Sequence, residues 1–163
     1  MKPTAERVRE LLDYNPLTGV FLWRVSPSRN TPDGSVAGAD CEGYRLIRVA
    51  GGRYKGHQIA WLYMTGEWPT SRIDHEDTNR GNNIWANLRL ATNSQNKANM
   101  GKRADNKSGF KGVSWYKPTK KWVAQIGCNG KREALGYFTD PEKAHSAYCE
   151  AAKRLFGEFA RFE

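Results

Sequence analysis

The sequence predicts an α+β protein made of two small modules. Over the first hundred residues, runs rich in β-branched and aromatic residues alternate with helical spacings. A polar, basic segment at residues 99–108 has no apolar period, and three strand-like runs and one amphipathic helix follow it. A length of 163 residues accommodates one or two domains of ordinary size and no large enzyme scaffold.

The first module is expected to begin with a helix that Thr4 caps and Asn15-Pro16 ends, because Val8, Leu11 and Leu12 then share one face. The pattern next predicts a strand at 19–25, a hairpin of strands at 44–49 and 53–55, a helix at 57–65, short strands at 72–74 and 88–90, and a helix opened by Thr92 or Asn93.

The second module is predicted to be a three-stranded sheet covered by one helix. Its strands are expected at 110–116, 121–126 and 132–137, with Asn129-Gly130 as the strongest turn signal. Pro141 begins the helix, in which apolar residues recur at spacings of three and four. We therefore expect a first domain at 1–98, a basic linker at 99–108 and a second domain at 109–163.

The charge points to a polyanionic partner. Lysine and arginine number 26 and aspartate and glutamate 17, which gives a net charge of +9. Residues 1–100 carry +3 and residues 101–163 carry +6, so the shorter C-terminal part holds two thirds of the excess. Six tryptophans argue against a disordered basic tail. No apolar run is long enough to span a membrane and no secretory signal is visible, so no membrane partner is expected.

The cysteines argue against two further classes of protein. Cys41, Cys128 and Cys149 are odd in number and form no Cys-x-x-Cys pair. This disfavours both a disulfide framework and a cysteine-built zinc site. A reducing cytoplasm suits such a set.

The densest polar stretch holds the parts that hydrolysis of a phosphodiester requires. Asp74 offers hard oxygens to a divalent cation, which neutralises the charge that builds on the phosphate. His75 carries an imidazole, whose unperturbed pKa of about 6.5 lets it take a proton from water at neutral pH. The amides of Asn87 and Asn96 bind a metal or fix an imidazole tautomer. The alternative is that Asp74, Asn83 and Asn87 are turn and cap residues and that His75 is a structural hydrogen-bonding group.

This stretch resembles the HNH endonucleases, in particular their phage and intron-encoded branch. The residues that carry the resemblance are Asp74-His75, Asn82-Asn83, Asn87-Leu88-Arg89-Leu90-Ala91-Thr92 and Asn96. The resemblance extends upstream to residues 14–21, 43–45 and 57–61, and covers roughly residues 10–97.

The resemblance implies a ββα-metal HNH nuclease domain, in which a hairpin and a helix hold one divalent cation against the scissile phosphate. His75 is then the general base, Asn87 orients His75, and Asp74 and Asn96 are metal ligands. Hard oxygen ligands suit Mg²⁺ or Mn²⁺ better than Zn²⁺. His57, at the start of an apolar helix, is expected to be a cap or core residue and stands outside the catalytic set.

The polar loop after His75 departs from the common family pattern. Glu76-Asp77-Thr78-Asn79 stands where an apolar residue followed by Asn-Gly is usual. The extra acid either binds a second cation or repels DNA, and the sequence favours neither.

The C-terminal module resembles the DNA-binding domain of the plant ethylene-response factors, the Apetala-two family. The matching segments are residues 110–113, 121–126, 135–138 and 144–152, within a match over about residues 108–160. That family places its three-stranded sheet in the major groove of duplex DNA, with the helix behind.

Strand alternation separates the side chains that face the helix from those that face DNA. The DNA-contact residues that we expect are Lys111, Ser114, Tyr116, Lys117, Lys120, Lys121, Gln125 and Arg132. The lysines at the first turn suit phosphates, since phosphate contacts supply affinity and no sequence information. Ser114, Tyr116 and Gly127 stand where the plant proteins carry guanine-reading arginines, so the guanine preference is not carried over.

Together these features predict a metal-dependent, homing-type DNA endonuclease, phage-encoded and acting in the cytoplasm of a bacterial host. The nuclease module cuts, and the C-terminal module binds double-stranded DNA. One alternative is a catalytically inactive, sequence-specific DNA-binding regulator. Another is a nuclease for single-stranded or structured nucleic acid, which requires stacking aromatics on the open sheet face, where Tyr116 is the clear candidate. A monomer or weak dimer is expected.

Overall fold

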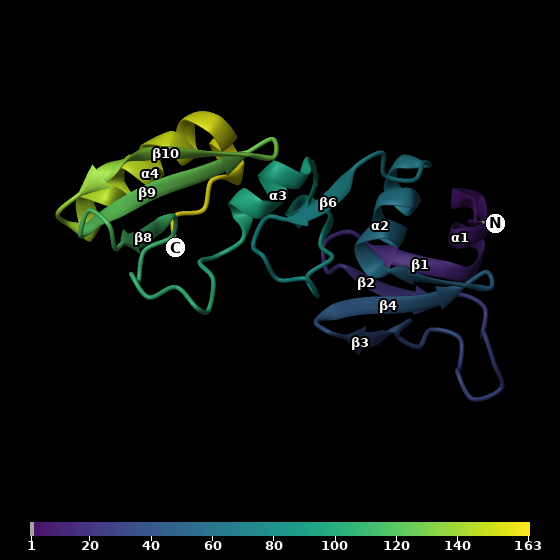
Figure 1. Cartoon of the computed structure of the whole chain (residues 1–163). Coiled ribbons are helices and arrows are strands. Elements are labelled where there is room, and N and C mark those ends of the chain that lie inside the picture. The colour runs from purple at the N-terminus through teal and green to yellow at the C-terminus, as the bar shows by residue number, and fades with distance from the viewer. Residues whose placement is uncertain (1) are drawn as a thin grey trace. The chain divides into compact units, whose positions relative to one another are not determined.

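Short antiparallel sheets accompanied by helices make up the chain, and this confirms the predicted α+β class. The computed structural model describes residues 2–163 (Figure 1). The chain divides into two units between Leu90 and Ala91, and each unit has its own core. The assignment of residues 1–98 and 109–163 as functional domains stays a prediction.

The first unit is built from three small sheets and two helices. Its elements are α1 (Ala5–Leu11), β1 (Leu12–Asn15), β2 (Val20–Trp23), β3 (Ala39–Cys41), β4 (Tyr44–Val49), β5 (Gly52–Lys55), α2 (Gly56–Thr65), β6 (Arg72–His75), a 3-10 turn (Trp85–Asn87) and β7 (Leu88–Ala91), whose last residue begins the second unit. β1 pairs with β2, β4 lies between β3 and β5, and β6 pairs with β7. The predicted hairpin at residues 44–55 is therefore present.

The predicted first helix extended too far. α1 ends at Leu11, and the next four residues form β1. Leu12 and Tyr14 are buried in strand alternation and pair with Trp23 and Phe21 of β2. β3 was not predicted, because its three residues are all exposed and give no apolar signal.

The second unit is a three-stranded antiparallel sheet with α4 packed against it. Its elements are α3 (Asn93–Asn99), β8 (Val113–Tyr116), β9 (Lys121–Cys128), β10 (Lys131–Phe138), α4 (Pro141–Phe156) and a 3-10 turn (Gly157–Phe159). The strand order is β10-β9-β8. Ala124 and Ala144 join β9 to α4 in one apolar cluster, as expected for a sheet covered by one helix.

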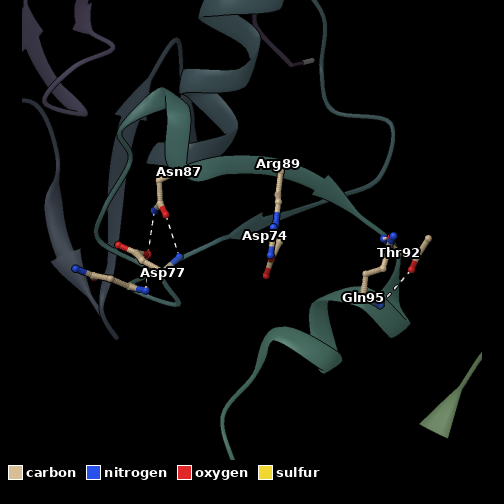
Figure 2. Close-up of polar contacts among 7 residues, drawn as sticks. Asp74, Asp77, Asn87, Arg89, Thr92 and Gln95 are labelled. Carbon is tan, nitrogen blue, oxygen red and sulfur yellow. Dashed lines mark hydrogen bonds and ion pairs between the residues drawn. The ribbon is translucent and has the colours of Figure 1, made fainter. Parts of the chain in front are cut away.

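Both predicted helix starts of this unit are confirmed. Thr92 caps α3: its hydroxyl accepts from Gln95 N at 3.2 Å, and Gln95 Oε1 accepts from Thr92 N at 2.8 Å (Figure 2). Asp140 caps α4, with Pro141 at its first turn. None of the helices in the described part of the chain is long and apolar enough to cross a membrane.

Candidate functional site

His75 ends β6 and lies buried against a second histidine. The rings of His57, at the start of α2, and His75 lie nearly perpendicular, with 4.9 Å between their centroids. His57 is 8% exposed, and its Nδ1 has no hydrogen-bond partner among the described atoms. The sequence predicted a cap or core residue here. The structure adds that this residue contacts the candidate base.

The ring of His75 faces the amide of Asn83. Asn83 Oδ1 lies 3.5 Å from His75 Nε2, and Asn83 Nδ2 donates to Gly81 O at 3.2 Å. The bond to Gly81 turns the carbonyl oxygen of this amide toward the ring, which suits the tautomer that carries its proton on Nε2. In that tautomer the lone pair of the neutral imidazole lies on Nδ1.

Asn83 is itself held by the N-terminal residues of the chain. The hydroxyl of Tyr14 donates to Asn83 O at 2.6 Å, in a buried position. A Cβ at Gly19, which has a φ of +71°, would lie 2.5 Å from the carbonyl carbon of Asn83. The sequence motif at residues 14–21 therefore has a structural reason, since it packs directly against the polar loop.

Asn87 closes the polar loop through Asp77. Its Nδ2 donates to Asp77 Oδ1 at 3.0 Å, and its Oδ1 accepts from Asp77 N at 3.0 Å (Figure 2). Nδ2 also donates to Asn82 O at 2.9 Å. No contact joins this amide to His75 in the described residues. The orientation of His75 by Asn87 stays a prediction, whereas Asn83 has the observed contact.

These hydrogen bonds also give Asp77 a defined place. Burial acts to raise the pKa of Asp77, but the bonds from Asn82, Asn79 and Asn87 outweigh it and lower that pKa. Asp77 is therefore an ionised hydrogen-bond acceptor that organises the loop. Neither sequence interpretation of the extra acid included this structural role.

Asp74 is buried on β6 and paired with Arg89 of β7, whose Nε donates to Asp74 Oδ2 at 3.1 Å (Figure 2). Asn96, the second predicted metal ligand, lies half-buried on α3 in the second unit. The described residues contain no group of three or more His, Cys, Asp or Glu that could hold a metal ion. Mg²⁺ commonly uses one or two carboxylates together with water and substrate phosphate, so the donor chemistry of Asp74 fits this ion.

Both histidines are kept neutral by their surroundings. Burial lowers the pKa of His57 to about 3, and the neighbouring His75 and Lys55 act in the same direction. Burial also lowers the pKa of His75, against the opposing effects of Asn83 and the two nearby aspartates. A neutral His75 at pH 7 has the protonation state that a general base needs.

Strand alternation in the sequence predicted which side chains of the second unit face α4 and which face away from it, and the strand register agrees. Ser114 pairs with Val123, Tyr116 with Lys121, Gln125 with Ala134, and Arg132 with Gly127, so these predicted contact residues share the face away from α4. Lys117 and Lys120 are exposed in the β8–β9 turn. Their binding to DNA stays a prediction.

Lys111 differs from the other predicted DNA contacts. Its ammonium donates to Ala98 O and Arg161 O within its own unit. Burial and the nearby Arg161 lower the pKa of Lys111 to about 8. The observed hydrogen bonds give this lysine a structural role that the sequence did not predict.

The open sheet face carries a second exposed aromatic residue that we did not predict. Tyr116 and Tyr137 are 40% and 49% exposed, and their ring centroids lie 5.3 Å apart. Strict alternation from Arg132 places Tyr137 on the other face, but a register shift between Ala134 and Gly136 reverses the alternation. The sequence signal for this shift is Gly136 within the strand, which is typical of a bulge.

The strand pair β6–β7 and the buried histidine pair lie in the part of the chain for which comparisons with known proteins give a family. The family model for HNH endonucleases matches residues 54–98. Protein 3.8 of Escherichia phage T7 is 35% identical over 107 residues, which are 65% of this chain and 88% of that protein. A protein of Acanthamoeba polyphaga mimivirus, named an uncharacterized HNH endonuclease, is 33% identical over 150 residues, 91% of this chain and 70% of the relative.

The chain belongs to the HNH endonuclease family. The matched segment runs from β5 to α3 and includes every residue of the predicted catalytic and metal-binding set. No solved structure matches the chain significantly.

Proposed function

We propose that the protein is a metal-dependent DNA endonuclease that hydrolyses phosphodiester bonds, with His75 as the general base. The observation that carries the proposal is the contact of His75 Nε2 with the Asn83 amide, in a chain of the HNH endonuclease family. This contact supports the tautomer in which Nδ1 is the basic atom. Burial keeps the ring neutral at the start of the reaction.

In this mechanism the residues of the chain orient the base and hold the metal donors. Nδ1 of His75 takes a proton from the attacking water. The side-chain oxygen Oδ1 of Asn83 keeps its bond to Nε2–H in both protonation states of the ring. Arg89 holds the carboxylate of Asp74 in place, and Asp74 and Asn96 are the proposed ligands of Mg²⁺ or Mn²⁺. When bound, the cation supplies charge neutralisation at the phosphate and the leaving oxygen.

The C-terminal unit is proposed to bind duplex DNA through the face of its sheet away from α4. The proposed contacts are Ser114, Tyr116, Lys117, Lys120, Lys121, Gln125 and Arg132. Lys111, which the sequence also predicted as a contact, donates to Ala98 O and Arg161 O instead. Support comes from the resemblance to the ethylene-response-factor domain, from the common face that the register gives the strand residues, and from the net +6 of residues 101–163. We also propose a homing-type role in the cytoplasm of a phage-infected bacterium, which the similarity to a phage T7 protein supports.

A second candidate is a nuclease for single-stranded or structured nucleic acid. The observation that favours it is the pair of exposed rings of Tyr116 and Tyr137 on the open sheet face. Stacking of bases on aromatic side chains is worth about 1–3 kcal/mol per base. The two candidate functions share the active site. They differ in whether the second unit prefers duplex DNA or single-stranded and structured nucleic acid.

Incubation with supercoiled plasmid, phage genomic DNA and single-stranded DNA tests both candidates. Each substrate is treated with Mg²⁺ or with chelator, using the wild type and His75→Ala. Cleavage by the wild type that requires Mg²⁺ and is lost in His75→Ala supports the endonuclease. If both proteins bind DNA equally and neither cuts, the nuclease proposal fails and the DNA-binding regulator replaces it.

A further inference from the structure

Two cations converge on one aromatic ring beside the histidine pair. Lys55, the last residue of β5, places its Nζ 3.6 Å from the ring centroid of Tyr44. Arg80, in the polar loop after β6, places its Cζ 5.2 Å from the same centroid. Tyr44 itself lies 5.5 Å from the ring of His57 and 6.4 Å from the ring of His75.

Neither cation has an acidic partner in the described part of the chain. The ion pairs found there join other residues, and Asp74, the buried carboxylate of the site, is paired with Arg89. Lys55 and Arg80 instead each contact the neutral ring of Tyr44. Cation–π contacts at exposed sites are weak, so they position the two charges without neutralising them.

The positive charges act on the candidate active site. After burial, the charge of Arg80 is among the influences that lower the pKa of His75, and that of Lys55 does the same for His57. Because the Tyr44 ring lies 6.4 Å from the ring of His75, an anion that binds these cations at that ring is close to the candidate base. An ammonium and a guanidinium together offer a point charge and a planar fork of donors, which suit the oxygens of a phosphate.

We propose that Lys55 and Arg80, held by the ring of Tyr44, bind a backbone phosphate of the nucleic acid next to the bond that His75 attacks. This proposal rests on the proposed nuclease function, and it assigns substrate positioning to residues outside the predicted catalytic and metal-binding set. The phosphate supplies the missing counter-charge for both cations. It also fixes the strand relative to His75, which raises the rate at which bound DNA is cleaved.

The test compares Lys55→Gln and Arg80→Gln with the control Arg29→Gln. Arg29 is an exposed arginine in the loop between β2 and β3, so the control removes the same charge elsewhere in the first unit. Single-turnover cleavage of supercoiled plasmid is measured at saturating protein with Mg²⁺. We expect each site variant to lower the rate at least tenfold and Arg29→Gln to stay within twofold of the wild type. Arg80→Lys should recover part of the loss, because it restores the charge without the fork.

Binding in the absence of metal gives an independent readout. The slope of log affinity against log salt concentration should fall by about 0.9 for each lost phosphate contact. We expect this fall for Lys55→Gln and Arg80→Gln, and no change for Arg29→Gln. The phosphate site is overturned if the two site variants match the control in both rate and slope. If the wild type does not cut, the nuclease proposal fails, and the salt slopes alone then decide whether the phosphate site exists.

Discussion

Oδ1 of Asn83 lies 3.5 Å from Nε2 of His75, and three separate segments of the first unit hold Asn83 in that position. Gly81 O accepts from its Nδ2, Tyr14 donates to its backbone oxygen, and Gly56 leaves room for its amide. The candidate base is thus oriented by a residue that is 2% exposed and fixed on several sides.

Asn83→Ala is expected to lower the rate of DNA cleavage by about 10–100-fold, the usual cost of losing a residue that orients a catalytic or metal-binding histidine. DNA affinity should change little, because the proposed DNA contacts lie mainly in the second unit. Single-turnover cleavage and a binding titration, carried out on the same preparation, separate the two effects.

Comparing Asn87→Ala with Asn83→Ala shows which of the two asparagines orients His75. Its amide bonds Asp77 and Asn82, so the variant should lose about 1–3 kcal/mol of stability from the unsatisfied loop groups. If Asn87→Ala has the larger effect on cleavage at a temperature where both variants are folded, and Asn83→Ala cuts normally, then Asn87 orients His75 as the sequence predicted.

Gly56→Ala should reduce cleavage by displacing the Asn83 amide. A Cβ at Gly56 would lie 2.8 Å from Asn83 Nδ2 and 3.2 Å from the Cβ of Arg45, which is closer than ordinary packing allows. Because the backbone at Gly56 is not left-handed, the effect comes from this contact and not from backbone strain. Gly101→Ala is the control, since its added Cβ would meet only ordinary contacts beyond 3.4 Å. Equal cleavage by both alanine variants would show that the Asn83 amide tolerates displacement.

Tyr14→Phe is expected to destabilise the first unit by about 1–3 kcal/mol, because the backbone oxygen of Asn83 would lose a buried hydrogen bond of 2.6 Å from the Tyr14 hydroxyl. Burial raises the pKa of Tyr14 to about 12, so this hydroxyl is protonated and donates throughout the accessible pH range. Tyr63→Phe serves as the control, since no hydrogen bond of its hydroxyl is found among the described residues. Urea unfolding of the two variants at pH 7 measures the difference, and equal midpoints would contradict it.

The sequence predicted the local features of the fold better than the contacts of the site. Thr92 as a helix cap and the common face of Ser114 and Tyr116 follow from neighbouring residues and strand periodicity, and both agree with the structure. The contact of His57 with His75 joins residues from different elements, and no local pattern encodes it. The same holds for Asn83, whose position depends on packing against the distant Tyr14. The sequence motif therefore did not predict contacts that depend on packing between distant segments.

Stability is expected to fall as the pH is lowered from 8 to 5, in part through His57. Its pKa is about 3 in the folded protein, against about 6.5 for an unperturbed imidazole. Between these values the unfolded chain binds more protons than the folded one, so the stabilisation is present above pH 6.5 and is lost as the pH falls. This histidine alone should account for about 2 kcal/mol of loss between pH 8 and pH 5. Urea unfolding at both pH values should show a smaller loss in His57→Gln, and the same loss in variant and wild type would contradict the assignment.

The turn between β8 and β9 should supply a large part of the electrostatic affinity for DNA. Replacing Lys117, Lys120 and Lys121 by glutamine is expected to weaken binding and to lower the salt slope by about three, one unit for each phosphate contact. The matched control replaces Lys143, Lys153 and Arg154, three exposed cations on α4, and removes the same charge from the other side of the sheet. Because a mere change in net charge would affect both triple variants alike, a salt slope that falls only in the β8–β9 variant localises the DNA to the open sheet face. Equal slopes in the two variants would mean that the second unit attracts DNA through its overall charge.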